Sequence, residues 1–420
     1  MERYVIEGGK RLTGTVVISG AKNSALPIIA ASLLTDKKVT IENVPEVMDV
    51  WTMIELVKYL GAKVEFNKNV LKIHTPKIKR IVAPYDIVRK MRASYYVLGA
   101  LVAREKKAVV SLPGGCAIGP RPIDLHIKGL NELGCKIEVE HGYIKARCKK
   151  LIGSEMNLQG AKGTSVGATI NTMLAAAMAS GTTVINAAAC EPEVVDVANF
   201  LISMGCQITG AGTPRITIRG NETFEESNYR IIPDRIETGT FAVAAAITKG
   251  KLNLKNCQPE HLTAVLDKLE EIGAVIEKDK DQLTITGTNP IKATDIFVAP
   301  YPGFPTDMQA QFMALLSVGS GTSTIKETIF ENRFMQALEL GRMGANITIE
   351  GDTAVIKGVK RLTGTTVMAS DLRASASLVL AALVAKGKTV VRRIYHLDRG
   401  YERFEEKLRN VGARIRREKE

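Results

Sequence analysis

Short, strongly apolar segments recur along the chain, and each is followed further on by residues that alternate between apolar and polar. The apolar segments lie at residues 26–34, 97–103, 173–179, 241–247, 312–316 and 378–384. Because they are apolar on nearly every side, they predict buried helices. Alternating stretches such as Lys63-Val64-Glu65-Phe66 predict strands with one face toward solvent.

A glycine followed by a small residue precedes each alternating stretch. The six glycines are Gly61, Gly134, Gly205, Gly273, Gly344 and Gly412. They are spaced roughly 70 residues apart, which is typical of one supersecondary unit used repeatedly. Glycine suits the left-handed conformation that commonly ends a helix. The chain is therefore predicted to contain six units, each with a buried helix, a strand, a second helix and a hairpin.

A second repetition indicates how the units are divided. Lys10-Arg11-Leu12-Thr13-Gly14-Thr15 recurs as Lys360-Arg361-Leu362-Thr363-Gly364-Thr365, so the N-terminal strand is expected to join the domain that holds the sixth unit. We predict a discontinuous domain of residues 1–21 and 230–420 and an inserted domain of residues 22–229, with three units in each. The expected fold class is α/β, with helices inside and sheets outside, and not a doubly wound Rossmann sheet.

The charge of the chain favours an anionic partner. The 420 residues include 57 Lys and Arg against 44 Asp and Glu, a net charge of +13. Nucleic acid, anionic lipid and phosphorylated small molecules are all possible partners. Aromatic residues make up only 5% and are not interleaved with basic ones, which weakens a single-stranded nucleic-acid platform.

The apolar segments also bear on location. None approaches the length of about 20 residues that a membrane helix needs. The first residues, Met1-Glu2-Arg3-Tyr4, do not resemble a signal or transit peptide. A cytoplasmic protein that contacts no membrane is the expectation.

Cationic side chains occur where the buried helices and second helices are predicted to start. A cation there opposes the helix dipole, so capping does not explain it, whereas binding of phosphate or carboxylate does. These residues are Lys22, Arg92, Arg121, Arg373 and Arg399. Ser24, Ser94 and Asp49 lie at similar positions, and for them a helix cap is an equally good interpretation.

The six cysteines are not spaced as a zinc site, and a cytoplasmic chain would keep them reduced. Cys135 and Cys206 occupy a repeat position that alanine fills in other units, which predicts core packing; Cys148 and Cys257 are interpreted in the same way. Cys190 stays ambiguous. Cys116 lies in a glycine-rich loop near Arg121, and we expect it to be reactive.

The remaining titratable residues give one candidate base. Asp307 lies at a predicted helix start, where a base and a helix cap are competing interpretations. The five histidines form no recognisable constellation, although His126 follows the Arg121 segment and could contact a ligand. No H-E-x-x-H, P-loop or G-x-S-x-G motif is present.

Taken together, several short motifs resemble one family over essentially the whole chain. They are Gly20-Ala21-Lys22-Asn23-Ser24, Met91-Arg92-Ala93-Ser94, Gly114-Gly115-Cys116-Ala117-Ile118-Gly119, Arg121-Pro122-Ile123-Asp124-Leu125-His126, Phe304-Pro305-Thr306-Asp307, Glu331-Asn332-Arg333-Phe334, Asp371-Leu372-Arg373-Ala374 and Asp398-Arg399-Gly400-Tyr401. The chain resembles the enolpyruvyl transferases, and within them the family of UDP-N-acetylglucosamine 1-carboxyvinyltransferases. The fold of that family is two inside-out α/β barrels, each a threefold set of such units.

The resemblance implies transfer of enolpyruvate from phosphoenolpyruvate to the 3-hydroxyl of UDP-N-acetylglucosamine, with release of phosphate. This is the first committed step of peptidoglycan synthesis, and fosfomycin would be an inhibitor. No cofactor or metal is implied, the protein is expected to be monomeric, and nucleic acid is not an expected partner. The implied catalytic residues are Cys116, Asp307, Lys22, Arg399 and Asp371. The implied substrate-binding residues are Lys22, Asn23, Arg92, Arg121, Pro122, Ile123, Asp124, Leu125, Asp307, Ile329, Arg333, Arg373 and Arg399.

Within this resemblance, Cys116 would be the general acid, and Asp307 would accept the sugar proton. Asp371 would move a proton in the second half-reaction. One position departs from the pattern: some family members have a diphosphate-facing lysine where this chain has Gly163, with Lys162 one residue away.

Two rival functions remain. One is 5-enolpyruvylshikimate-3-phosphate synthase, which shares the fold and the donor. The other is a non-catalytic DNA sliding clamp, which is also built from repeated α/β units but would have no use for Cys116 and Asp307.

Overall fold

The computed structural model describes residues 2–112 and 123–419. Two compact units are present: residues 2–19 and 233–419 form the discontinuous unit, and residues 20–112 and 123–232 form the inserted unit. In the described part of the chain there are six four-stranded sheets, three in each unit.

The sheets of the inserted unit share one strand order. Each has a short edge strand parallel to its neighbour, followed by two antiparallel pairings. The first sheet is β14 (Ser227–Arg230), β3 (Lys38–Glu42), β5 (Val70–His74) and β4 (Lys63–Asn67). The second is β6 (Val82–Ala83), β7 (Lys107–Ser111), β9 (Tyr143–Arg147) and β8 (Lys136–Glu140). The third is β10 (Glu155–Asn157), β11 (Thr182–Asn186), β13 (Arg215–Arg219) and β12 (Gln207–Thr209).

The discontinuous unit follows the same plan, but the N-terminal strands complete two of its sheets. The fourth sheet is β2 (Thr13–Val17), β15 (Lys251–Lys255), β17 (Gln282–Thr286) and β16 (Val275–Lys278). The fifth is β18 (Ile296–Phe297), β19 (Thr322–Lys326), β21 (Thr353–Lys357) and β20 (Asn346–Glu350). The sixth is β22 (Thr366–Met368), β23 (Lys388–Arg392), β1 (Glu2–Glu7) and β24 (Arg414–Lys419).

The repeated N-terminal sequence now has a structural explanation. Residues 10–15 include the first half of β2, whereas residues 360–365 end directly before β22, and both strands are parallel edge strands of their sheets. The sixth sheet differs from the predicted hairpin, because β24 pairs with β1 from the start of the chain and not with a strand that follows it.

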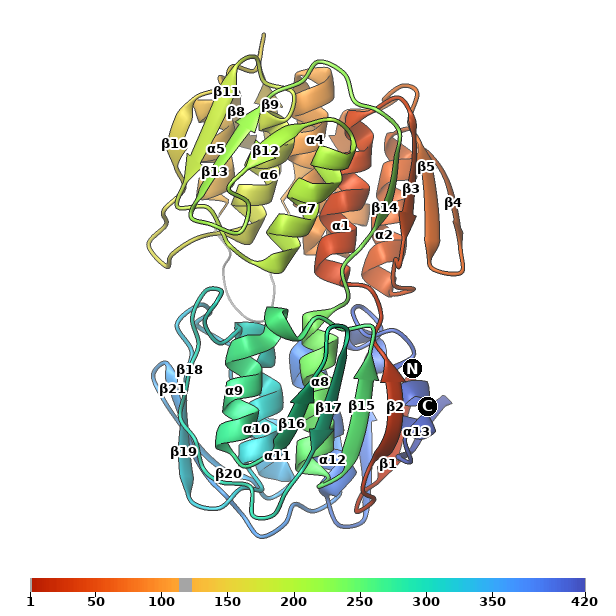
Figure 1. The fold of residues 1–420 in the computed structure, drawn as a ribbon, viewed down its shortest axis with the longest axis vertical. Coiled ribbons are helices and arrows are strands. Elements are labelled where there is room, and N and C mark those ends of the chain that lie inside the picture. The colour runs from red at the N-terminus through yellow and green to blue at the C-terminus, as the bar shows by residue number, and fades with distance from the viewer. Residues whose placement is uncertain (1, 113–122, 420) are drawn as a thin grey trace. The chain divides into compact units, whose positions relative to one another are not determined.

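Buried helices fill the interior of each unit (Figure 1). In the inserted unit they are α1 (Lys22–Ala31), α4 (Tyr96–Glu105) and α6 (Val166–Ala176), and in the discontinuous unit α8 (Arg235–Ile247), α10 (Gln309–Leu316) and α12 (Leu372–Val384). The second helices of the repeats are α2 (Met48–Leu60), α5 (Asp124–Glu132), α7 (Pro192–Ser203), α9 (Thr263–Glu271), α11 (Gln336–Arg342) and α13 (Phe404–Asn410). Shorter helical segments are η1 (Ser32–Leu34), α3 (Tyr85–Val88), η2 (Arg92–Tyr95), η3 (Pro259–Leu262), η4 (Thr306–Met308) and η5 (Ile394–His396).

The sequence pattern accounts for this arrangement. In α8 every residue from Ile236 to Ile247 is buried, and this stretch includes the apolar segment 241–247 from which a buried helix was predicted. In β3 the side chains of Val39 and Ile41 are buried while Lys38 is exposed, so one sheet face packs on the helices. All six repeat glycines have positive φ angles, between 91° and 126°, which explains why glycine recurs after the second helix. The predicted α/β class, with six units, buried helices and outer sheets, is confirmed.

None of the helices in residues 2–112 and 123–419 combines the length and apolar character needed to cross a lipid bilayer.

Candidate active site

Asp307 is the centre of a charged cluster in the discontinuous unit. It lies in η4, directly before the buried helix α10. Its Oδ1 accepts a hydrogen bond from Nη2 of Arg333 at 2.7 Å, and its Oδ2 accepts two from Arg373, at 2.9 Å from Nη2 and 3.2 Å from Nε. The two guanidinium side chains are 5% exposed and the carboxylate is 27% exposed. The fold thus brings together three residues that the sequence analysis selected from separate segments.

The electrostatics of the cluster fix the charge of Asp307. Burial alone would raise the pKa of this carboxyl group, but the two guanidinium groups outweigh burial and hold the pKa well below its usual range. Burial would likewise lower the pKa of Arg373, yet Asp307 raises it above its ordinary value. Asp307 is therefore ionised at neutral pH, the state in which a base must begin.

Arg373 keeps one donor available. Among the described residues, its buried Nη1 has no hydrogen-bond partner. A buried donor without an acceptor is costly, so a ligand oxygen at this position would be favoured. The guanidinium also lies 5.3 Å from the ring of Tyr401, whose hydroxyl is within 2.8 Å of Oγ1 of Thr240.

Glu327 links the segments that contain Asp307 and Ile329, and it was not among the residues predicted from the sequence. This buried carboxylate accepts a hydrogen bond from Oγ1 of Thr306 at 2.7 Å and one from the backbone N–H of Ile329 at 2.8 Å. It therefore fixes the segment before Asp307 and the segment that contains Ile329. In the sequence it is marked only by its position directly after strand β19, in which buried and more exposed residues alternate.

Asp371 acts as the N-cap of α12. Its Oδ1 accepts hydrogen bonds from the backbone N–H groups of Arg373 at 2.9 Å and Ala374 at 3.0 Å. This is the capping geometry, which stabilises the helix that carries Arg373. Arg399 lies beyond the C-terminal end of η5, where it is half-buried. Arg399 and Asp371 are both within electrostatic range of His396, whose pKa is lowered first by burial and then by Arg399.

In the inserted unit, Lys22 is the first residue of α1 and lies 3.3 Å from Oδ2 of Asp49, near the start of α2. Asn23 follows it in the first turn and is half-buried. The N-cap residues of the two helices, Ala21 and Val47, make no side-chain cap hydrogen bond, and the ion pair with Lys22 is one contact of Asp49. Ser94 is not a cap either, since its hydroxyl donates to the carbonyl of Met91.

A neutral hydrogen-bond network begins at His126, the residue that directly follows the segment of Ile123, Asp124 and Leu125. His126, in α5, is buried, and its Nδ1 is 2.9 Å from Nδ2 of Asn171 in α6. The amide of Asn171 is oriented by two unambiguous partners, because it donates to the carbonyl of Tyr95 and accepts from the N–H of Gly99. Nδ2 must therefore donate to Nδ1, which places the imidazole proton on Nε2.

This network also fixes the charge of His126. Burial, assisted by the positive charge of Arg92, lowers its pKa to about 4. The imidazole is consequently neutral near pH 7. Arg92, at the start of η2, is half-buried and within electrostatic range of His126, so the structure brings Arg92 close to the start of α5.

The turn at Gly163 explains the departure noted in the sequence. Gly160 and Gly163 exchange backbone hydrogen bonds at 3.0 and 3.2 Å, and Gly163 has a φ angle of +95°. A lysine at this position would be strained. Lys162 is exposed at the tip of the turn, and a Cβ atom on Gly160 would lie 3.0 Å from Cδ1 of Leu125. The turn that contains Lys162 therefore lies close to the Leu125 segment.

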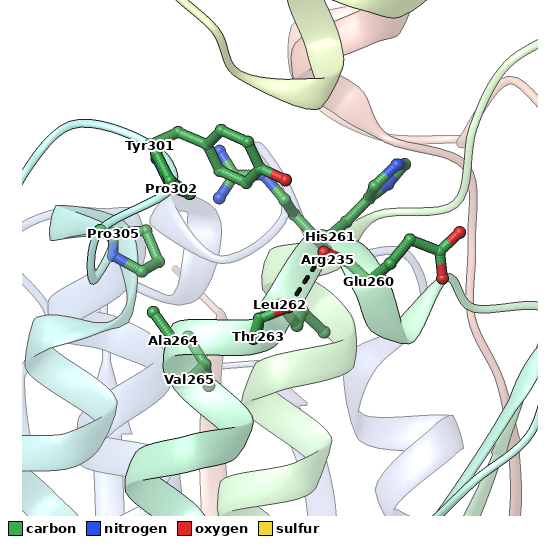
Figure 2. Close-up of a pocket in the computed structure, with 11 residues that line it drawn as sticks. Arg235, Glu260, His261, Leu262, Thr263, Ala264, Val265, Tyr301, Pro302 and Pro305 are labelled. Atoms are coloured by element: carbon green, nitrogen blue, oxygen red, sulfur yellow. Dashed lines mark hydrogen bonds between the residues drawn. The ribbon is translucent and has the colours of Figure 1, made fainter. Parts of the chain in front are cut away.

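A small pocket in the discontinuous unit borders the Asp307 segment along the chain. Figure 2 shows Tyr301 and Pro302 on one side of it, and His261 and Glu260 on the other. Arg235 and Pro305 complete this part of the wall, and the guanidinium of Arg235 lies 5.7 Å from the Tyr301 ring. None of the predicted site residues that the structure describes lines it.

Three predicted site residues, Cys116, Arg121 and Pro122, lie outside the described residues. The five described cysteines are free thiols. Cys135, Cys206 and Cys257 are buried, as predicted, and burial raises their thiol pKa values to about 12, 11 and 12. Burial also raises the pKa of Cys148 and Cys190. The described cysteines are thus poor nucleophiles at neutral pH.

Comparison with known proteins agrees with the fold. Residues 6–408 match the family described as EPSP synthase (3-phosphoshikimate 1-carboxyvinyltransferase). The chain is 55% identical over 417 residues to the UDP-N-acetylglucosamine 1-carboxyvinyltransferase of Desulfosudis oleivorans, and 54% identical over 419 residues to UDP-N-acetylglucosamine 1-carboxyvinyltransferase 2 of Carboxydothermus hydrogenoformans, with 99% of each chain covered.

A solved structure is also similar. The enolpyruvyl transferase NikO from Streptomyces tendae superposes with a TM-score of 0.89 at 26% identity, and 99% of both chains is covered. The match extends over nearly all of the chain, and the chain therefore belongs to the EPSP synthase family of enolpyruvyl transferases.

Proposed function

We propose that this chain transfers the enolpyruvyl group of phosphoenolpyruvate to the 3-hydroxyl of UDP-N-acetylglucosamine and releases phosphate. The observation that carries the proposal is the ion-paired cluster of Asp307 with the buried Arg333 and Arg373. We assign the role of base to Asp307 and the binding of a carboxylate to the two arginines. The acceptor is inferred from relatives at 54–55% identity that carry the name of this activity. The enzyme would act in the cytoplasm as a monomer, without a cofactor, in the first committed step of peptidoglycan synthesis.

The reaction is an addition followed by an elimination. In the addition, the methylene carbon of phosphoenolpyruvate gains a proton while the sugar oxygen bonds to the adjacent carbon and loses its own proton. In the elimination, the bond from that carbon to the phosphate oxygen breaks, a methyl proton is removed, and the double bond forms again. We assign the first proton to Cys116 and the removal of the hydroxyl proton to Asp307.

The ion pairs of Asp307 suggest how it becomes a stronger base. Both of its oxygens are bound by guanidinium groups, which lowers its affinity for a proton. In the proposed reaction the carboxylate of phosphoenolpyruvate binds Arg333 and Arg373, including the buried Nη1 of Arg373. Asp307 then shares its donors with a second anion, and its pKa rises at the moment when it must accept a proton.

The remaining cations would bind the other anionic groups. Lys22 and Arg399, together with Arg121, are assigned to the transferred phosphate. Asn23, Arg92 and the segment of Ile123, Asp124 and Leu125 are assigned to the nucleotide sugar, with Ile329 in contact with it beside Asp307. Asp371 would move the methyl proton in the elimination, in addition to its capping contacts with α12.

The experiment that tests this proposal is phosphate release from phosphoenolpyruvate. Release is expected with UDP-N-acetylglucosamine and not with shikimate-3-phosphate. Release with shikimate-3-phosphate alone would favour 5-enolpyruvylshikimate-3-phosphate synthase. Absence of release with both, accompanied by salt-sensitive DNA binding, would favour the clamp.

The role of Cys116 has its own test. Cys116→Ala is expected to lose turnover or product release, whereas Cys116→Asp, which still carries an acid, keeps some activity. Fosfomycin, an epoxide, is expected to alkylate Cys116, and peptide mapping would locate the label. Full activity of Cys116→Ala, or a label on another residue, would remove the assignment.

A further inference from the structure

Arg417, on the C-terminal strand β24, gathers three carboxylates around one guanidinium group. Nη2 and Nη1 donate to Oδ1 and Oδ2 of Asp398 at 2.6 and 3.1 Å, which is a bidentate pair. Nε donates to Oε1 of Glu405 at 2.8 Å, and Nη1 donates to Oε2 of Glu2 at 2.8 Å. Nη2 also donates to the hydroxyl of Tyr4 at 2.9 Å. Such a set of charge-assisted bonds holds the guanidinium in one orientation.

The bidentate partner, Asp398, directly precedes Arg399. Both belong to a segment, residues 393–403, that is mostly irregular, with only the short η5 inside it. Arg393 and Arg403, at its two ends, have φ angles of 59° and 48°. Its backbone hydrogen bonds are local turns, such as those from the N–H groups of Asp398 to Ile394 and of Tyr401 to Leu397, and none of the described strands pairs with it. Side-chain anchors therefore tie these turns to the rest of the unit.

The other side of Arg399 is anchored through Tyr401. Its ring is buried, its hydroxyl lies 2.8 Å from Oγ1 of Thr240, and Nε2 of Gln311 donates to it at 3.4 Å. Arg373, the partner of Asp307, lies 5.3 Å from its ring. Arg399 is thus held between an anchor on β24 and an anchor on the Asp307 cluster.

We propose that Arg417, through its bidentate pair with Asp398, is a positioning residue that directs Arg399 toward its anionic ligand. This inference rests on the proposed function, in which Arg399 binds the phosphate of phosphoenolpyruvate. Arg417 does not contact the substrate. It acts by limiting the movement of the backbone that carries Arg399, and a shift of about 1 Å in a binding group can lower a rate by up to about a hundredfold.

The test compares two variants that each remove one carboxylate from the same guanidinium. Asp398→Asn removes the bidentate ion pair next to Arg399, whereas Glu2→Gln removes an ion pair with strand β1. For Asp398→Asn we expect KM for phosphoenolpyruvate to rise about tenfold while KM for UDP-N-acetylglucosamine changes by less than about twofold. Glu2→Gln is expected to leave both constants unchanged. Arg417→Lys, which keeps the charge but cannot form the fork, should resemble Asp398→Asn.

A measurement without substrates separates this inference from the proposed function. Hydrogen exchange of the backbone amides in residues 397–401 should become faster in Asp398→Asn and stay unchanged in Glu2→Gln. Equal effects of the two variants, in exchange or in KM, would mean that Arg417 only stabilises the fold and would overturn the proposal. If the unaltered protein had no turnover but the exchange difference appeared, the assignment of substrates would fail while the anchoring of the segment would stand.

Discussion

Two polar clusters, one in each unit, hold their buried groups in different ways. In the discontinuous unit these groups are charged: Asp307 is paired with Arg333 and Arg373. In the inserted unit the cluster is neutral: the buried imidazole of His126 is held by the amide of Asn171. An ion-paired cluster responds to competing anions and hardly to pH near neutrality, whereas a neutral buried imidazole responds to acid. The same repeat thus supports two kinds of site chemistry.

The largest effect is expected from Asp307→Asn. The amide can neither accept the sugar proton nor balance two buried guanidinium groups, so phosphate release should fall about a thousandfold. The same change leaves buried charges unpaired, and a loss of about 3 kcal/mol in unfolding free energy is expected. Steady-state phosphate release and urea unfolding measure the two effects.

Asp279→Asn is a suitable control, because Asp279 is exposed in a hairpin turn. This substitution should change neither the rate of phosphate release nor the free energy of unfolding. If Asp307→Asn kept activity within about tenfold of the unaltered protein, Asp307 would not be the base.

The two arginines of the cluster should contribute unequally to kcat/KM for phosphoenolpyruvate. Arg373 donates two hydrogen bonds to Asp307 and has a third donor available, whereas Arg333 donates one. Lysine cannot reproduce the fork, so Arg373→Lys should lower kcat/KM for phosphoenolpyruvate about a hundredfold and Arg333→Lys only about tenfold. Equal losses would show that the bidentate geometry is not what the site uses.

The neutral network of the inserted unit predicts an acid-sensitive contribution to stability. His126 has a pKa of about 4 in the folded protein, below the ordinary value of about 6.5. The unfolded chain therefore binds a proton that the folded protein does not bind, and stability falls as the pH drops below about 6.5. Between pH 7 and pH 4.5 this contribution should cost about 2–3 kcal/mol.

His126→Gln offers the comparison, because it lacks the titrating group. The difference in unfolding free energy between the unaltered protein and His126→Gln should shrink as the pH is lowered over this range. A difference that stayed constant with pH would mean that His126 is not held neutral.

The smallest effect is expected at Lys162. It is exposed at the tip of the turn next to the Leu125 segment, and exposed ion pairs contribute at most about 1 kcal/mol. Lys162→Ala should therefore raise KM for UDP-N-acetylglucosamine about threefold to fivefold, and less at high salt. Lys149→Ala, at another exposed position, is the control and should have no effect. Identical kinetics for both variants would mean that no side chain replaces the lysine absent at Gly163.

The repeats were predictable because they depend on local signals. Buried helices such as α8, the alternating strands and the glycines that end the second helices all follow from residues near one another in the chain. Asp307 and Arg373 were also found, since both lie near the start of a buried helix.

The pairings within the site were not predictable in this way. Asp307 contacts Arg333 and Arg373, which are 26 and 66 residues away, and only the packing of the units determines which charges meet. Glu327 and Asn171 carry no motif, and their importance follows from partners that the fold supplies. Asp371 shows that a candidate chemical group can also serve as a helix cap.

The sixth sheet has a consequence for how the chain is made. Strand β1 lies between β23 and β24, so β1 must wait until β24 has been synthesised before its sheet is complete. The inserted unit contains all of its strands once residue 230 has emerged, and it can fold while synthesis continues. A chain that stopped before residue 414 would leave β1 with an open edge, and an open edge invites pairing with another chain. Truncated products of this protein should therefore aggregate through the N-terminal strand.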